Sequence, residues 1–387
     1  MQVNKHKVIL FANTLWFLHN FKLPLIEELK NKQIEVDLIY LRLGPPVGNK
    51  NKFLLNNVKQ YTFLNYFFCC IKKFFLKDTK KKTFLFSFTI GPIILSILPI
   101  FKNTIRFATL EGLGRVFSSR VLVFRVLKRI LEIIYRIIFL NPYKGVFVLN
   151  YADYAYLLEK KIVPISKIHI IPGTGIDSRI FNPDNLKKKR IKLGILNKEN
   201  KIKLDEMFIT YIGRISVDKG FFRFIAAINY LLSDPSYTNL KFRIISPKSD
   251  IKNIDYDLRR FLLNKNILLK EYVVDPINYY ANSKLIVIPS TYGEGLSRVA
   301  LESGLLGIPI VAIVNRGLSS LFIDGILGET TMEIEPYGIS KLIKQVIDNY
   351  SSYSDLPKEV FLNLSSKYDN KASSDSVISV LSSYLDS

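Results

Sequence analysis

Short apolar runs alternate with helical patterns along most of this chain. Apolar runs at 8–12 and 36–40 flank a helical pattern, and further strand and helix pairs follow at 83–100 and 145–160. The same alternation resumes near 208 and continues through the second half. Buried strands that alternate with helices are typical of parallel sheets covered on both faces, so the pattern predicts an α/β fold.

The most informative stretch, 285–312, predicts a strand, a loop, a helix and another strand. Glu294 lies in the loop, and Glu302 lies eight residues later, about 8 to 12 Å along the helix axis. Backbone N–H groups at the helix start form an anion site between the two carboxylates, at Gly295, Leu296 and Ser297. An elongated ligand with hydroxyl groups at both ends and a phosphate between them, such as a nucleotide sugar, fits this spacing. Two solvated helix carboxylates are the simpler alternative.

A basic loop follows the first strand of the second half. The strand at 208–212 ends at Gly213, and Arg214 and Lys219 follow in one loop before a helix. Two cations at the carboxyl end of a strand can neutralise a pyrophosphate leaving group without a metal ion. A solvated basic loop is the alternative.

Both motifs resemble those of the retaining GT-B glycosyltransferases of family 4, in their bacterial surface-polysaccharide type. The similar segments are E-G-L-S-R-V-A-L-E with the following G-I-P-I-V-A, and the loop G-R-x-x-x-x-K-G. The resemblance implies that Glu294 faces the donor sugar and Glu302 the ribose, while Arg214 and Lys219 hold the diphosphate. The predicted catalytic residues are Glu294, Arg214 and Lys219, and the predicted donor-binding residues are Gly213, Gly295, Leu296, Ser297, Glu302 and, through backbone contacts to the base, Tyr272 and Val273.

The first half resembles the same family in two places. The opening W-F-x-x-x-x-x-L-P-L and the loop T-L-E-G-L-G-R-V-F are similar to segments of surface-polysaccharide relatives. A lone histidine is about as often a structural hydrogen-bonding group, and glycines also suit an ordinary turn. The sequence departs from the family at Phe88, where many relatives carry histidine, and at Ser320, where they carry an acid. The predicted acceptor-side residues are His19, Asn20, Gly112 and Gly114.

The resemblance implies a GT-B architecture, in which two doubly wound Rossmann-like domains face a cleft. We expect an acceptor-binding domain at 1–172, a linker and charged connection at 173–207, and a nucleotide-sugar-binding domain at 208–365. A C-terminal helix at 366–387 is expected to pack back toward the first domain. The implied reaction moves a sugar, with retention, from a nucleoside-diphosphate donor, UDP in our expectation, to a hydroxyl of a lipid-linked or growing glycan of an O-antigen or capsule.

The composition adds a strong positive charge. The chain has 55 lysines and arginines against 33 acids, a net charge of +22. No nucleic-acid recognition motif accompanies this charge, so an anionic membrane surface or phosphorylated substrates explain it better. The candidate membrane contacts are Lys72, Lys73, Lys77, Lys80, Lys81 and Lys82, and the basic edge of a helix at 121–140, Arg125, Lys128 and Arg129. For that helix we favour a core position over membrane docking.

The location follows from what the sequence lacks. No apolar run is long and uncharged enough to span a bilayer, and we read no signal peptide and no disulfide framework. We therefore expect a cytoplasmic protein, peripheral at the inner face of the cell membrane.

The sequence predicts no metal site and no cofactor apart from the nucleotide-sugar co-substrate. Asp255-Tyr-Asp257 matches the D-x-D metal signature of another glycosyltransferase fold, but it opens a predicted helix and we interpret it as chance. Two other classes stay open. A GT-B-fold sugar-nucleotide epimerase would turn over donor without acceptor, and a basic nucleic-acid-binding protein would show salt-dependent affinity.

Overall fold

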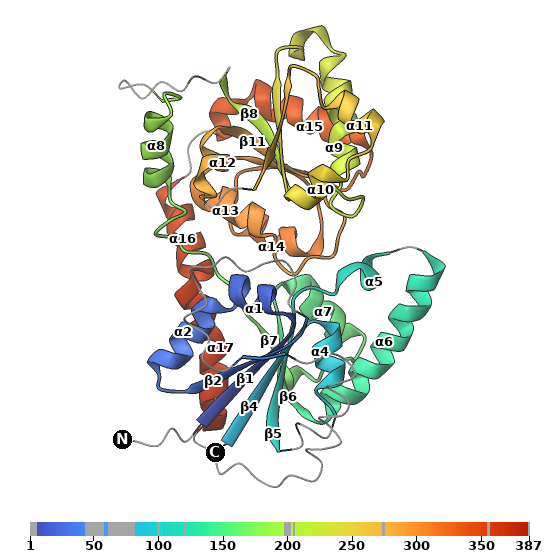
Figure 1. The fold of residues 1–387 in the computed structure, drawn as a ribbon, viewed down its shortest axis with the longest axis vertical. Helices are drawn as coiled ribbons and strands as arrows, with labels where there is room; N and C mark the ends of the chain where they lie inside the picture. The colour runs from blue at the N-terminus through green and yellow to red at the C-terminus, as the bar shows by residue number, and fades with distance from the viewer. Residues whose placement is uncertain are drawn as a thin grey trace. The chain divides into compact units, whose positions relative to one another are not determined.

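The computed structural model describes residues 6–42, 58–60, 82–98, 101, 103–119, 121–196, 203, 206–272, 275–353 and 357–385. The chain divides into two compact units (Figure 1). One unit combines Met1–Gly175 with Asn370–Ser387, and the other is Ile176–Asp369. Within the described residues each unit builds one sheet in which all neighbouring strands are parallel.

The first unit has the strand order β3-β2-β1-β4-β5-β6-β7. Its strands are β1 (His6–Thr14), β2 (Glu35–Arg42), β3 (Val58–Gln60), β4 (Lys82–Phe88), β5 (Thr104–Leu110), β6 (Tyr143–Val148) and β7 (Ile168–Ile170). Its α-helices are α1 (Leu15–Phe21), α2 (Leu23–Asn31), α4 (Ile90–Leu95), α5 (Gly114–Ser118), α6 (Leu122–Leu140), α7 (Tyr151–Glu159) and α17 (Asn370–Leu385).

The second unit has the strand order β10-β9-β8-β11-β12-β13. Its strands are β8 (Phe208–Ile212), β9 (Lys241–Ser246), β10 (Ile267–Glu271), β11 (Ser283–Ile288), β12 (Ile310–Ile313) and β13 (Gly328–Thr331). Its α-helices are α8 (Pro183–Lys192), α9 (Phe221–Leu232), α10 (Lys248–Lys252), α11 (Tyr256–Phe261), α12 (Ile277–Ala281), α13 (Arg298–Leu306), α14 (Arg316–Ile323), α15 (Pro336–Asp348) and α16 (Lys358–Tyr368).

Aromatic side chains from neighbouring strands form the centre of the first sheet. The ring of Phe107 on β5 stacks on Phe86 of β4 at 4.9 Å and on Phe147 of β6 at 6.0 Å. All three rings are at most 1% exposed. Tyr384 of α17 meets the Phe107 ring edge-on at 5.4 Å, so the last helix of the chain closes this core.

The connection between the units differs from the linker expected at 173–207. Residues from Ile176 onward belong to the second unit, and α8 packs on its core through the buried Leu186. Arg190 of α8 donates hydrogen bonds to the carbonyls of Ala281 and Ser283, at 3.2 and 3.3 Å. These contacts make the charged stretch around α8 a part of the second unit rather than a free connection.

Helix α6 combines two environments. One face is buried and includes Leu131, Tyr135 and Phe139, as the core interpretation of this helix predicts. The opposite face leaves many large apolar side chains exposed, which the core interpretation does not predict. Among the described helices none has the length and apolar character needed to cross a bilayer.

We expect Phe107→Ala to lower the free energy of unfolding by about 3 to 5 kcal/mol, because it removes a fully buried ring from a close-packed cluster. Chemical denaturation followed by circular dichroism measures this change. The control is Phe222→Ala, which truncates a ring that is 46% exposed and should change stability much less. Equal losses in the two variants would contradict the central place of the Phe107 stack.

Candidate active site

The sheet of the second unit reverses its strand order between β8 and β11. From β8 the chain continues through β9 and β10 toward one edge, and from β11 through β12 and β13 toward the other. In open parallel sheets, ligands bind outside the carboxyl ends of the strands at such a switch point. The loops that follow β8 and β11 carry Arg214, Lys219 and Glu294, so the three predicted catalytic residues lie at this edge.

An ion pair joins these two loops. Lys219 Nζ donates a hydrogen bond to Glu294 Oε1 and lies 5.6 Å from the centroid of the Tyr292 ring. The Lys219 and Glu294 side chains keep 27% and 15% exposure, so both remain open to solvent. A partly solvated pair of this kind contributes about 0 to 1 kcal/mol to stability. The pair therefore matters more for the placement of its charges than for the fold.

Two glycines allow the close approach of the site loops. Gly220 has a φ of 73°, and a Cβ there would lie 1.9 Å from the carbonyl oxygen of Pro289. A Cβ on Gly317, in the first turn of α14, would lie 2.8 Å from the carbonyl oxygen of Glu294. A larger residue at Gly220 would push the two loops apart, and one at Gly317 would push α14 away from the Glu294 loop. Glycine at these positions therefore helps to set the distance between Lys219 and Glu294.

The second predicted carboxylate, Glu302, is held firmly on α13. It is 8% exposed, and its Oε2 accepts a hydrogen bond of 2.6 Å from the Tyr280 hydroxyl, while its Oε1 accepts one of 2.8 Å from Arg298 Nε. Burial raises the pKa of Tyr280 well above its usual value, and the neighbouring Glu302 adds to this rise. Each carboxylate oxygen has a further lone pair, so Glu302 can still accept a hydrogen bond from a ligand hydroxyl.

The backbone of the Arg214 loop is supported from two sides. The Tyr211 hydroxyl donates to the Arg214 carbonyl at 2.6 Å, and the Ile215 N–H donates to Asp250 Oδ2 at 3.0 Å. The pKa of Tyr272 is raised to about 12, mainly by burial. Asp250 adds to this rise and Arg214 opposes it. A pocket of about 340 Å³ adjoins this loop, with Arg214 and Asp250 in its lining. This volume falls within the usual range for small-molecule sites.

The other predicted donor residues lie in the same loops. Gly213 ends β8 with its N–H bonded to the Ile245 carbonyl at 3.0 Å, and a Cβ there would lie 3.0 Å from the Tyr211 hydroxyl oxygen. Ser297 is the N-cap of α13 with an extended backbone, directly after Gly295 and Leu296. Val273 lies outside the described residues.

Asp255 and Asp257 lie at the start of α11. Asp255 caps α11 by accepting a hydrogen bond of 2.8 Å from the Leu258 N–H, so the predicted helix start is confirmed. Over the described ranges, no cluster of three or more histidine, cysteine, aspartate or glutamate side chains is arranged to bind a metal ion. Ser320, which stands where relatives in the resemblance carry an acid, is buried on α14, and its hydroxyl has no hydrogen-bond partner among the described residues.

The first unit has its own switch point, between β1 and β4. Helix α1 follows β1 and carries His19. Burial lowers the pKa of His19, and its Nε2 meets no hydrogen-bond partner in the part of the chain that the structure describes. Asn20 is exposed and donates to the Trp16 carbonyl at 2.8 Å. Thr89 follows β4 with a φ of 69°, a left-handed conformation that is uncommon for a β-branched residue. Its buried hydroxyl has no hydrogen-bond partner within the described ranges.

A buried lysine between α1 and α2 pairs with a carboxylate of the loop that follows β5. Lys22 is 4% exposed, and its Nζ donates to Glu111 Oε1 at 2.6 Å. The same ammonium lies 4.6 Å from the centroid of the Phe88 ring and 5.5 Å from that of Phe17. Phe88, at the family's histidine position, therefore offers its ring face to a cation. Sequence reasoning missed Lys22 and Glu111, although both stand in the segments that resemble the family.

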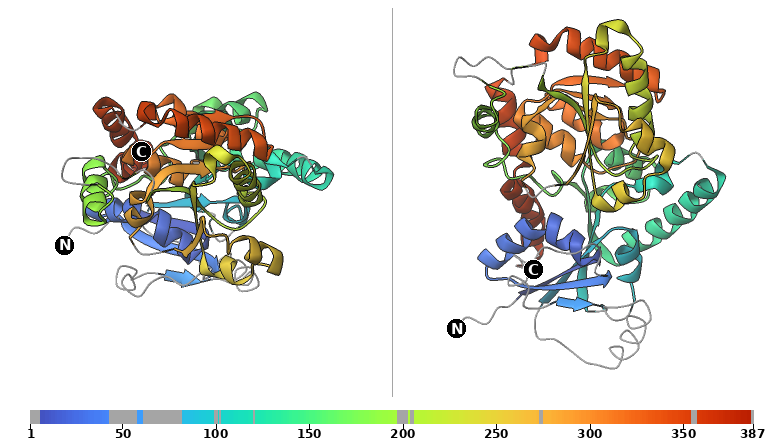
Figure 2. Two further views of the ribbon diagram at one scale, coloured as in Figure 1. Left: turned by 90° about the horizontal axis from the view of Figure 1, so that it is seen from above. Right: turned by 45° about the horizontal axis from the view of Figure 1, so that its top comes forward.

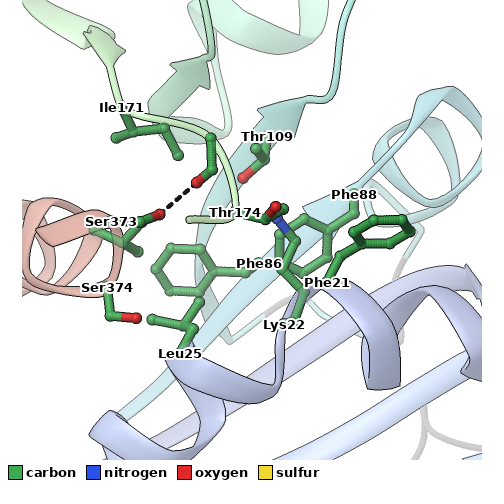
Figure 3. Close-up of a pocket in the computed structure, with 12 residues that line it drawn as sticks. Phe21, Lys22, Leu25, Phe86, Phe88, Thr109, Ile171, Thr174, Ser373 and Ser374 are labelled. Carbon is green, nitrogen blue, oxygen red and sulfur yellow. Dashed lines mark hydrogen bonds between the residues drawn. The ribbon is translucent and has the colours of Figure 1, made fainter. Parts of the chain in front are cut away.

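Figure 3 shows a pocket in the first unit that Lys22 and Phe88 line with residues of α17. Its volume of about 20 Å³ is enough for about one water molecule, so it is a packing void rather than a sugar site. The Ser373 hydroxyl beside it donates to the Gly173 carbonyl. The four predicted acceptor-side residues are not among those that line it. Gly112 and Gly114 form a turn with φ values of 101° and 71°, which favour glycine.

The chain folds into two doubly wound α/β units, and this architecture defines the fold class. Charged side chains gather near the switch point of each unit. Over 97% of this chain the structure superposes on 99% of HepE from Anabaena solved with UDP, with a TM-score of 0.72 and 16% sequence identity. The predicted GT-B class of fold, with two Rossmann-like domains, is confirmed.

Sequence comparisons point to the same class in the second half. Residues 195–360 match the family described as "Glycosyl transferases group 1". The chain is 30% identical over 203 residues to the capsular polysaccharide biosynthesis glycosyltransferase CapM of Staphylococcus aureus. The aligned residues cover 52% of this chain and 50% of CapM. The chain is 28% identical over 180 residues to a lipopolysaccharide 1,2-N-acetylglucosaminetransferase of Salmonella typhimurium, 43% of each chain. These matches span half or less of each relative.

We expect Tyr280→Phe to lower the free energy of unfolding by about 1 to 3 kcal/mol, because it removes a hydrogen bond to a buried carboxylate. Thermal and urea denaturation measure the change. The matched control is Tyr256→Phe. Because Tyr256 is 77% exposed, removal of its hydroxyl should leave the free energy of unfolding unchanged. An unchanged stability for Tyr280→Phe would mean that the hydroxyl does not hold Glu302 in place.

Proposed function

We propose that this protein is a retaining, family 4 glycosyltransferase that moves a sugar from a nucleoside-diphosphate donor to a hydroxyl of a growing surface glycan. The observation that carries the proposal is the ion pair of Lys219 with Glu294 at the switch point, with Arg214 on one of the same loops. The similarity to CapM and to the lipopolysaccharide transferase supports surface-polysaccharide assembly as the setting.

The proposed donor is a UDP-sugar. HepE, which shares the fold, was solved with UDP and with UDP-glucose. In this chain the positive loop after β8 and the N-terminus of α13 offer charge and N–H donors for the two phosphates. Tyr280 and Arg298 hold the Glu302 carboxylate, and in the proposal this carboxylate accepts a hydrogen bond from a ribose hydroxyl.

The proposed chemistry is transfer without a metal ion or other cofactor. As the bond from the anomeric carbon to the diphosphate oxygen breaks, negative charge grows on the leaving diphosphate. Arg214 and Lys219 stabilise this charge through fixed positive groups, which cost no reorganisation at the moment of reaction. Glu294 lies beside Lys219, where its carboxylate can orient the donor sugar. The acceptor oxygen forms the new bond to the anomeric carbon, and its proton passes to the leaving diphosphate. The proposed acceptor is a lipid-linked glycan at the inner face of the cell membrane.

The test of the proposal is product analysis. Purified protein is incubated with single UDP-sugars and with glycan acceptors, and the new linkage is read by NMR. We expect a glycoside with the anomeric configuration of the donor. Conversion of the donor to its epimer without acceptor would support the epimerase alternative, and an inverted product would contradict retention.

We expect Glu294→Gln to reduce the transfer rate at least about 10²-fold, because the neutral amide no longer supplies a charge beside the donor sugar. The melting temperature should stay within a degree or two, since the ion pair is partly solvated. Release of UDP measures the rate, and Glu359→Gln, on the exposed start of α16, is the control. A large loss of stability with normal activity per folded molecule would assign Glu294 to the fold instead.

We expect Arg214→Gln and Lys219→Gln each to slow transfer by about 10²-fold, and a chelator to leave the wild-type rate unchanged. The reason is that these two cations carry the charge compensation that a metal ion would otherwise supply. Lys252→Gln removes an exposed lysine of α10 and serves as the control. Loss of activity with chelator, restored by magnesium or manganese, would contradict this and return attention to Asp255 and Asp257.

A further inference from the structure

One face of α6 leaves an unusual amount of apolar surface uncovered. The helix, at the edge of its unit, reaches away from the strands of that unit (Figure 1 and Figure 2). From Leu122 to Ile130 it contains no buried residue. The exposed apolar side chains repeat every three or four positions, which puts them on one side of the helix. They are Leu122, Val123, Val126, Leu127, Ile130, Ile133, Ile137 and Leu140, each 38% to 72% exposed.

The exposed charged side chains of α6 are all positive. Arg125, Arg129 and Arg136 are exposed next to the apolar side chains. The acid of this helix, Glu132, is 4% exposed, pairs with Arg129 at 3.2 Å and accepts a hydrogen bond from the Tyr156 hydroxyl. The solvent face of α6 is therefore apolar and positive without an exposed carboxylate.

We propose that this face docks on an anionic lipid membrane, with α6 lying in the plane of the interface. The apolar side chains would enter the boundary between headgroups and acyl chains, and the arginines would meet the lipid phosphates, as interfacial helices do. A helix of 19 residues provides about 28 Å of contact. A second copy of the chain fits less well, because a two-fold contact through this face would bring like charges together.

This placement differs from attachment through lysine charge alone. Residues 72, 73, 77, 80 and 81 lie outside the described residues, so the inference depends on α6. Charge attraction fades as salt shortens the Debye length, whereas insertion of apolar side chains does not. The docking proposal therefore predicts that the apolar and the basic side chains of α6 make separate contributions to the affinity for the membrane. It does not depend on the proposed sugar transfer.

The experiment is sedimentation of the full chain with vesicles of phosphatidylcholine alone or of equal parts phosphatidylcholine and phosphatidylglycerol. We expect the wild type to bind the anionic vesicles and to bind them less as salt is raised. The variant Val126→Gln/Ile130→Gln/Ile133→Gln/Ile137→Gln should bind at least about tenfold more weakly at every salt concentration. The matched control, Leu263→Gln/Ile323→Gln, changes side chains of the other unit that are 80% and 84% exposed, and should bind like the wild type.

A second variant separates charge from apolar contact. Arg125→Gln/Arg129→Gln should weaken binding to anionic vesicles by about thirtyfold at low salt and have little effect at high salt. An Ile130→Trp variant should show indole fluorescence that is quenched by brominated acyl chains, while Ile323→Trp should not. This optical readout needs only one conservative change, so it stands even if the fourfold variant folds poorly.

Three results would overturn the proposal. The first is sedimentation of the fourfold variant with anionic vesicles to the same extent as the wild type. The second is Ile130→Trp fluorescence that brominated acyl chains do not quench in the vesicle-bound protein. The third result is a wild-type dimer that the fourfold variant converts to a monomer, with no vesicle binding by either, which would make the face a contact between copies. None of these measurements involves a sugar donor, so their failure is distinguishable from failure of the proposed transfer.

Discussion

The close approach of two loops at the edge of one parallel sheet is the constraint on which the second unit depends. Gly220 sits against the Pro289 carbonyl and Gly317 against the Glu294 carbonyl, with no room for a Cβ at either place. Because β8 and β11 are neighbours at the reversal of strand order, their loops already share this edge. The glycines then bring Lys219 within hydrogen-bond reach of Glu294, and the charges of the site follow from that distance.

The switch point of the first unit has a different arrangement of charged groups. It holds a buried ammonium, Lys22, between a carboxylate and two aromatic rings. Burying a charge is costly unless it is paired, and here Glu111 supplies the partner while Phe88 and Phe17 supply ring faces. Thr89, whose backbone is left-handed, directly follows Phe88 in the chain. Strain and a buried charge in one place are more typical of a functional edge than of a structural one.

The sequence predicts the fold class well because strand and helix alternation is a local pattern that every element repeats. It also predicts which loops carry Lys219 and Glu294, since a strand end and a helix start are readable from neighbouring residues. The pairing of Lys22 with Glu111, 89 positions apart, depends on tertiary packing and has no local signal. For the same reason the apolar pattern of α6 identifies a helix but does not tell which of its apolar side chains meet a core.

The first unit is built from two segments that lie far apart in the sequence, and this affects how the protein folds during synthesis. Its core includes Tyr384 against Phe107, and α17 packs against α2, so residues from both ends of the sequence complete one body. During translation the intervening second unit leaves the ribosome before α17 exists. The second unit can therefore fold while the first sheet still lacks α17, and the docking of α17 then completes the first unit. A nascent chain stalled before 370 would present an open apolar surface to chaperones.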